Sequence, residues 1–143
     1  MEARARLRNR DSREVLEDHI RLRERGELER DLERNYDPQV LILTGRHVFK
    51  GHDGVRDAAR LLAEAVAPDS YRFRALVIGD RMGYCEWTAT GDEAVIRDGV
   101  DSYLVEGGMI RAQTIHYTAI SSSLSTAGMR DGQPGLEVTR VRE

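Results

Sequence analysis

Two apolar segments joined by a glycine turn, together Gly99–Tyr117, constrain the fold of this chain more than any other stretch. The turn is Glu106-Gly107-Gly108, and the segments on either side are long enough to pair as an antiparallel hairpin. Asp101 lies in the first segment beside apolar residues such as Val100 and Leu104. A carboxylate in an apolar strand is costly to bury unless it is paired, hydrogen-bonded or protonated. Asp101 is therefore the first candidate for a functional residue.

The hairpin belongs to a longer run of predicted strands. A period of two begins at Tyr71 and predicts strands over about 71–78 and 84–90. The hairpin supplies two more, over about 94–105 and 109–120, and short turns separate all four. Four successive strands with short turns predict an antiparallel meander.

Amphipathic segments precede the meander. They predict one helix capped by Asp11 or Ser12, a short helix over 27–34, and a third helix from Asp53 to about residue 67. A short apolar strand over 40–44 lies between the second and third helices. The order predicts an α+β domain, with three N-terminal helices packed on a strongly curved antiparallel sheet. We expect residues 1–11 to be a flexible N-terminus, 12–120 to be the domain, and 121–143 to be a tail that could add an edge strand through Leu136, Val138 and Val141.

Composition excludes some functions. The chain of 143 residues has 22 basic and 25 acidic residues and a net charge of −3, and no tract has a large excess of either sign. This argues against a nucleic-acid-binding surface. Cys85 is the only cysteine, so no internal disulfide can form, and we read it as a small core residue. No apolar segment is long enough for a signal peptide or a membrane span, which predicts a cytoplasmic protein with no membrane partner.

Several short motifs occur in a characteristic order. They are Gly26, the Tyr36-Asp37-Pro38 turn, the Gly51–Arg56 segment (GHDGVR), Val100-Asp101-Ser102-Tyr103 and Gly107-Gly108-Met109-Ile110. Together with the order of elements, they resemble the nuclear transport factor two-like superfamily, specifically its SnoaL-like bacterial branch, over about residues 12–120. The resemblance implies a cystatin-like cone, in which a bent sheet wraps around the helices and leaves a deep, largely apolar pocket. It also implies a homodimer.

The superfamily includes ketosteroid isomerases, polyketide cyclases, epoxide hydrolases and non-enzymatic binding modules, so the fold alone does not define a function. Aligned from Gly26, His19 falls at the oxyanion-hole tyrosine of the steroid isomerase pattern, and Asp101 falls at its protonated aspartate. The general base of that pattern would lie in Leu41-Ile42-Leu43, where no side chain can accept a proton. The carboxylate that the epoxide-hydrolase pattern requires is missing from 116–119.

These considerations give a set of candidate site residues. Asp101 and His19 are the candidate catalytic residues, although Asp101 could instead be a structural partner and His19 a satisfied core histidine. The candidate ligand-binding residues are Tyr36, Trp87, Tyr103, Gln113, Ile115 and Tyr117. Of these, Gln113, Ile115 and Tyr117 share one strand face, and a register slip of one residue would turn that face away from the pocket.

Two functions remain open at this point. The first is a cofactor-free isomerase, cyclase or lyase acting on a small apolar molecule that bears a carbonyl or phenol. The second is a non-catalytic ligand-binding or dimerisation module. No cofactor is expected. No metal is expected either, because His47, His52 and Asp53 match no recognised ligand spacing.

Overall fold

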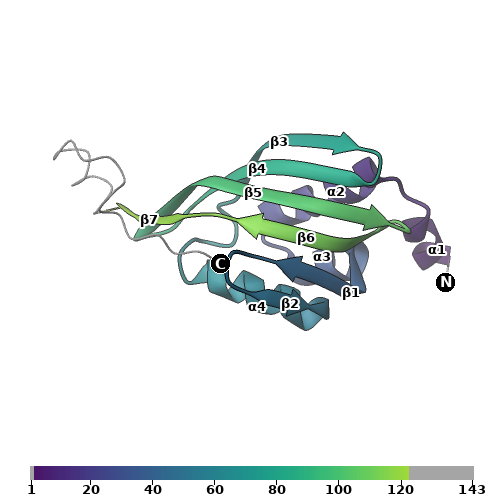
Figure 1. Cartoon of the computed structure of the whole chain (residues 1–143), viewed down its shortest axis with the longest axis horizontal. Coiled ribbons are helices and arrows are strands. Elements are labelled where there is room, and N and C mark those ends of the chain that lie inside the picture. The colour runs from purple at the N-terminus through teal and green to yellow at the C-terminus, as the bar shows by residue number, and fades with distance from the viewer. Residues whose placement is uncertain (1, 123–143) are drawn as a thin grey trace.

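The computed structural model describes residues 2–122, and Figure 1 shows how their elements are arranged. The helices are α1 (Glu2–Arg8), α2 (Ser12–Glu24), α3 (Leu28–Asn35) and α4 (Gly51–Ala63). The strands are β1 (Tyr36–Leu43), β2 (Val48–Lys50), β3 (Arg72–Gly79), β4 (Met82–Thr90), β5 (Ala94–Glu106), β6 (Met109–His116) and β7 (Ala119–Ser121).

The strands form one sheet in the order β2-β1-β6-β5-β4-β3, and β7 pairs with the start of β5. The predicted meander is confirmed as β3 to β6. The sheet is mixed rather than purely antiparallel, because β1 lies parallel to β6. A parallel pair needs a long crossover connection. Here α4 and four further strands, β2 to β5, lie between β1 and β6 in the chain.

Helices cover one face of the sheet. In Figure 1, α2 and α3 lie behind the strands, and α4 runs beside β1 and β2. Register shifts interrupt the pairing of β3 with β4, β4 with β5, and β5 with β6. Such bulges bend a sheet and increase its twist. The predicted α+β cone is therefore confirmed, with its core between the curved sheet and the helices.

The N-terminal region contains one helix that the sequence did not predict. α2 begins as predicted, because the Asp11 carboxylate accepts a hydrogen bond from the Glu14 N–H at 2.9 Å, and Glu14 completes a capping box. α1 precedes it and buries no residue, so it has no apolar stripe for a periodicity argument to find. Arg10 follows α1 and donates to the Asn35 side chain at 2.8 Å and to the Gly108 carbonyl at 3.1 Å. The flexibility of residues 1–11 stays a prediction.

Several element boundaries differ from the prediction. α4 begins at Gly51, so Asp53 lies in its first turn rather than at its cap. β1 begins at Tyr36, inside the predicted turn. α4 ends at Ala63 rather than near Ala67. The Ala67 N–H instead donates to the Thr90 carbonyl of β4 at 2.8 Å. The last predicted strand is two strands, because the Asp98 carboxylate accepts the Thr118 N–H at 2.8 Å and interrupts the ladder.

The predicted tail overlaps the end of the described chain. β7 pairs with residues 94–96 of β5, and only its last residue, Ser121, falls within the predicted tail. Leu136, Val138 and Val141, which were expected to form an edge strand, lie outside the described residues. Within residues 2–122, no helix has the length and apolar character needed to cross a membrane.

Candidate functional site

Asp101 lies in the middle of β5 and points into the core, where it is only 6% exposed. Its carboxyl group lies within reach of three donors. The Trp87 indole N–H donates to Oδ1 at 2.9 Å, and the Gln113 amide donates to Oδ2 at 2.9 Å. The Tyr103 hydroxyl lies 3.1 Å from Oδ2. Burial raises the pKa of Asp101 above its normal value, although the three hydrogen-bond donors oppose this effect.

His19 lies on the inner face of α2 and is 1% exposed. Its Nδ1 lies 2.8 Å from the carboxylate of Asp31, a fully buried residue of α3. Its Nε2 lies 2.9 Å from the Tyr103 hydroxyl. A continuous hydrogen-bonded chain therefore runs from Asp31 through His19 and Tyr103 to Asp101.

The orientation of Gln113 is fixed by a second tyrosine. The Tyr36 hydroxyl donates to Gln113 Oε1 at 2.6 Å, so the amide nitrogen must face Asp101. Burial raises the pKa of both Tyr36 and Tyr103 well above the normal value, which keeps both phenols protonated. The two tyrosines thus act as hydrogen-bond donors and acceptors rather than as anions.

The hydrogen-bonded chain from Asp31 to Asp101 can hold one shared proton either on Asp101 or on His19. If His19 is neutral and donates from Nδ1 to Asp31, its Nε2 accepts from Tyr103. Tyr103 then has no proton left for Asp101, so a protonated Asp101 would donate to the Tyr103 oxygen. If His19 is an imidazolium, Nε2 donates to Tyr103, and Tyr103 donates to an ionised Asp101. The two arrangements differ only by protons shifted along the chain, so Tyr103 can relay a proton between Asp101 and His19.

A small internal cavity of about 30 Å³ borders these groups. Its walls are His19, Arg23, Leu62, Tyr71, Phe73, Trp87, Asp101, Gln113 and Ile115. We call it the inner cavity. This volume is enough for about one water molecule.

A second cavity of about 340 Å³ lies on the outer side of Arg23 and Tyr71, and both residues line the two cavities. We call it the vestibule. Its other walls are Gly26, Leu28, Arg56, Ala59, Arg60, Ala63 and Pro68. The Arg23 guanidinium carbon lies 5.7 Å from the centre of the Tyr71 ring. The vestibule and the inner cavity therefore adjoin at Arg23 and Tyr71.

Trp87 can reach Asp101 because its cross-strand partner is a glycine. Trp87 in β4 pairs with Gly99 in β5. A Cβ atom added to Gly99 would lie 2.3 Å from the indole ring, which is closer than real contacts allow. The absence of a side chain at 99 therefore lets the indole lie across β5.

The structure places the predicted site residues in three groups. Those that line the inner cavity are His19, Trp87, Asp101, Gln113 and Ile115. Tyr36 and Tyr103 belong to the hydrogen-bonded network behind it. Tyr117 is buried against Trp87, with ring centres 5.9 Å apart. Gln113, Ile115 and Tyr117 all face the core, in the register that the sequence predicted.

Sequence reasoning missed two polar residues of the site. Arg23 follows His19 by one helical turn, and this i,i+4 spacing could have placed it on the same face of α2. Asp31 follows the inward-facing Leu28 by three residues and directly precedes Leu32, and this i,i+3,i+4 spacing could have placed it on the buried face of α3. Its role depends on the packing of α3 against α2, which sequence periodicity does not specify.

Other candidate chemistry has no support in the described chain. Burial raises the pKa of Cys85 to about 12, which leaves its thiol protonated at neutral pH. His52 contacts the Tyr36 carbonyl at 2.9 Å, and Asp53 pairs with Arg56 at 2.8 Å. Among residues 2–122, no three His, Cys, Asp or Glu side chains are grouped so that they could hold a metal ion.

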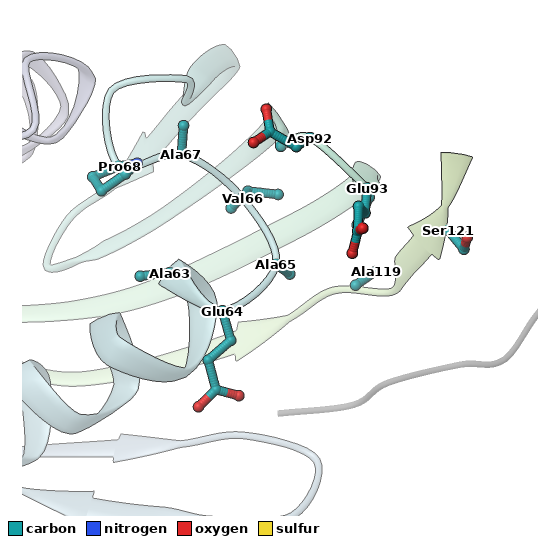
Figure 2. A pocket seen from close by; sticks show the side chains of 12 residues that line it. Ala63, Glu64, Ala65, Val66, Ala67, Pro68, Asp92, Glu93, Ala119 and Ser121 are labelled. Carbon is teal, nitrogen blue, oxygen red and sulfur yellow. The ribbon is translucent and has the colours of Figure 1, made fainter. Parts of the chain in front are cut away.

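Figure 2 shows a larger hollow, of about 660 Å³, at the far end of α4. It lies between the residues after α4, the β4–β5 turn and β7. Its titratable side chains are Glu64, Asp92 and Glu93, all exposed, and the remaining walls are mainly small apolar residues. The residues that line this hollow include no buried polar group. The inner cavity, with its buried Asp101, is therefore the better candidate site.

Comparison with protein families and with curated protein sequences gives no match. Solved structures do match. A nuclear transport factor two-like protein of unknown function from Burkholderia xenovorans is 13% identical, with 73% of this chain and 80% of that chain covered and a TM-score of 0.63.

Two further matches are described provisionally as polyketide cyclases. One, from Sinorhizobium meliloti, is 9% identical over 71% of this chain and 93% of that one, with a TM-score of 0.58. The other is SnoaL-like and comes from Mesorhizobium loti. It is 15% identical, with 73% of this chain and 97% of that chain covered and a TM-score of 0.54. The predicted resemblance is thus confirmed as a shared fold: this chain has the nuclear transport factor two-like architecture, which SnoaL-like proteins also have.

Proposed function

We propose that this protein binds a small apolar molecule with a carbonyl or phenol oxygen inside the cone, and that Asp101 exchanges a proton with it without a cofactor. The reaction would be an isomerisation, cyclisation or elimination. One observation carries the proposal. Asp101 is a buried carboxyl group on the wall of an internal cavity, at the end of a hydrogen-bonded chain to His19 and Asp31.

The chemistry follows from the two proton arrangements. A protonated Asp101 donates to the ligand oxygen and stabilises the negative charge that develops there. An ionised Asp101, with the shared proton held on His19, accepts a proton directly from the ligand and returns it to another ligand atom, while Tyr103 stays hydrogen-bonded to both residues. In an isomerisation, the proton that leaves one carbon returns to another, so no second reactant is needed. Asp101 would contact the ligand, whereas His19 would act through Tyr103 as a proton store.

Ligand entry requires a rearrangement. The inner cavity holds only about 30 Å³, whereas the vestibule holds about 340 Å³. A cavity of roughly 150 Å³ can hold a benzene molecule, so the vestibule has the size of a small aromatic ligand. Movement of the Arg23 and Tyr71 side chains would join the two spaces and expose Asp101 to the ligand.

The alternative is a binding or dimerisation module without chemistry, and one observation favours it. In β1, where the steroid isomerase pattern has its base, the buried residue of Leu41-Ile42-Leu43 is Ile42, while both leucines face outward. No second carboxylate therefore faces the cavity from β1. Turnover distinguishes the two functions, because the module predicts that Asp101→Asn changes affinity or stability only.

A thermal-shift screen tests the proposal. Wild type, Asp101→Asn and the exposed control Asp92→Asn are heated with 2-naphthol, apolar ketones and steroids. A ligand that binds the native state raises Tm by mass action. We expect at least one phenol or ketone to stabilise wild type and Asp92→Asn, and to lose most of that effect with Asp101→Asn. If no compound shifts wild type, or if Asp101→Asn responds as wild type does, Asp101 is a structural residue.

A further inference from the structure

Arg23 is the only arginine or lysine in residues 2–122 that is neither ion-paired nor fully exposed. Ten other arginines lie within 4.0 Å of a carboxylate. The described basic residues that lack such a partner are Arg4, Arg6, Arg8, Arg25, Arg46, Lys50, Arg72 and Arg97, and all of them are exposed. A half-buried guanidinium without a carboxylate partner is unusual, because charged groups away from bulk water are normally paired.

The surroundings of Arg23 keep it charged, although no carboxylate of residues 2–122 lies in ion-pair contact with it. Its guanidinium lies beside the Tyr71 ring. Burial opposes the charge, but the nearby oxygens of Tyr36 and Asp31 raise the pKa of Arg23 above its normal value. The Asp31 carboxylate is already occupied by His19 at 2.8 Å and Asn35 at 2.8 Å. Arg23 thus presents a guanidinium with no carboxylate of the described chain in contact, where the vestibule adjoins the inner cavity.

The other two arginines of the vestibule differ from Arg23. Arg56 contacts Glu29 and Asp53, each at 2.8 Å, and Arg60 contacts Asp57 at 2.8 Å. Both are therefore already neutralised on the protein surface. The remaining vestibule walls include Leu28, Ala59 and Pro68, which suit an apolar body.

We propose that the ligand is an apolar carboxylic acid, whose carboxylate pairs with Arg23 while its apolar body lies in the vestibule. A bidentate guanidinium–carboxylate pair is among the strongest and most directional contacts available in a protein. The carbonyl or phenol oxygen of the same ligand then points past Tyr71 toward Asp101. This inference rests on the proposed function and narrows its substrate class to aryl or alkyl acids bearing such an oxygen.

Matched acid and amide probes test the inference on the full chain. Binding of 2-naphthoate, 2-naphthamide and 2-naphthol is measured by calorimetry for wild type, Arg23→Gln, Arg23→Lys and the control Arg60→Gln. A hydrogen bond to a charged group contributes about 1.5–3 kcal/mol, so we expect wild type to prefer naphthoate over naphthamide by about tenfold or more. Arg23→Gln should abolish this preference, Arg23→Lys should keep part of it, and Arg60→Gln should keep all of it. A thermal melt of each variant confirms that it is folded.

Other binding results would contradict the anion inference, the proposed small-molecule site, or both. If the neutral probes bind wild type as well as naphthoate does, the anion inference fails while the proposed pocket stands. If Arg23→Gln keeps the preference, or if Arg60→Gln loses it, Arg23 is not the anion site. If neither acid nor neutral probes bind wild type, both the inference and the proposed small-molecule site are overturned. Should Arg23→Gln fail to fold, Arg23→Lys and Arg60→Gln still decide between a charge at 23 and a charge elsewhere.

Discussion

The proposed chemistry depends on Asp101, because this residue is buried and lies beside three potential hydrogen-bond donors. Burial favours the neutral acid, whereas N–H groups aimed at its oxygens favour the carboxylate. Burial has the larger effect, so the pKa of Asp101 is raised. A carboxyl group whose neutral form is favoured in this way can donate a proton to a bound ligand, which is a property expected of a general acid.

The titration of Asp101 can be measured directly. We expect carbon-13 NMR of the aspartate carboxyls to show Asp101 titrating above the normal aspartate range, whose reference value is about 3.9. The assigned resonance should be absent from spectra of Asp101→Asn. A value near or below 4 would contradict the acid role.

The same pKa shift predicts how stability depends on pH. Because the folded state binds this proton more tightly than the unfolded state, Asp101 contributes most to stability below its unfolded pKa. That contribution is lost as the pH rises through the folded pKa. Relative to wild type, Asp101→Asn should therefore gain in free energy of unfolding as the pH increases from 4 to 8. Urea denaturation across this range measures the difference, and a constant difference would contradict the raised pKa.

Cys85 provides a test of how closed the interior is. Its thiol is fully buried, it lies 3.6 Å from the Tyr103 hydroxyl, and its pKa is raised to about 12. We expect a disulfide reagent at pH 8 to label the native protein far more slowly than the protein in urea. Rapid native labelling, with the same kinetics as in urea, would show that the core around Tyr103 opens readily.

At the scale of elements, the β4–β5 pair positions the site. Trp87 and Asp101 are held together because Gly99 leaves space for the indole. Any larger residue at 99 would force the ring away from the strand, and the N–H donor would leave Asp101.

Gly99→Ala tests this arrangement. Overpacking a core position costs about 1–3 kcal/mol, and we expect a loss of about 2 kcal/mol in the free energy of unfolding. The indole N–H resonance of Trp87 should also shift. Gly79→Ala is the matched control on β3, because an added Cβ there meets nothing within 4 Å. We expect its effect to stay within about 0.5 kcal/mol; equal losses for both variants would contradict a specific role for Gly99.

The same elements show what sequence patterns can and cannot predict. The alternation from Tyr71 onward defined β3 to β6 and put Gln113 and Ile115 on one shared face, because side chains along a strand alternate between its two faces. Only the family resemblance assigned that face to the interior. The parallel pairing of β1 with β6 was not predictable in this way, since strand order depends on the packing of the whole domain. Helical spacing does place Arg23 and Asp31 on the inner faces of α2 and α3, but their contacts with other elements result from how the helices pack, which periodicity does not specify.

At the scale of the whole molecule, the outer face of the sheet carries an apolar row. Leu41, Ala112, Leu104 and Met82 pair in register across β1, β6, β5 and β4, so their side chains share one face. Leu41 is 36% exposed and Met82 is 61% exposed. An exposed apolar row of this kind is typical of an interaction surface, and the predicted homodimer would bury it.

Sedimentation velocity tests the dimer. We expect wild type at micromolar concentration to sediment as a dimer, and Leu104→Glu to sediment as a monomer because a charge would be buried at the centre of the row. Arg81→Glu, beyond the end of β3, is the control and should remain dimeric. A monomeric wild type would contradict the prediction.

Trp87 is the only tryptophan in the chain, and its indole N–H donates to the candidate catalytic carboxyl group. All tryptophan emission of this protein therefore comes from one fluorophore in hydrogen-bond contact with Asp101 and on the wall of the inner cavity. A proton gained or lost by Asp101, or a ligand that displaces the indole, changes the electric field at that single chromophore. The protein thus carries its own optical reporter, and both ligand binding and the protonation of Asp101 can be followed by intrinsic fluorescence without a label.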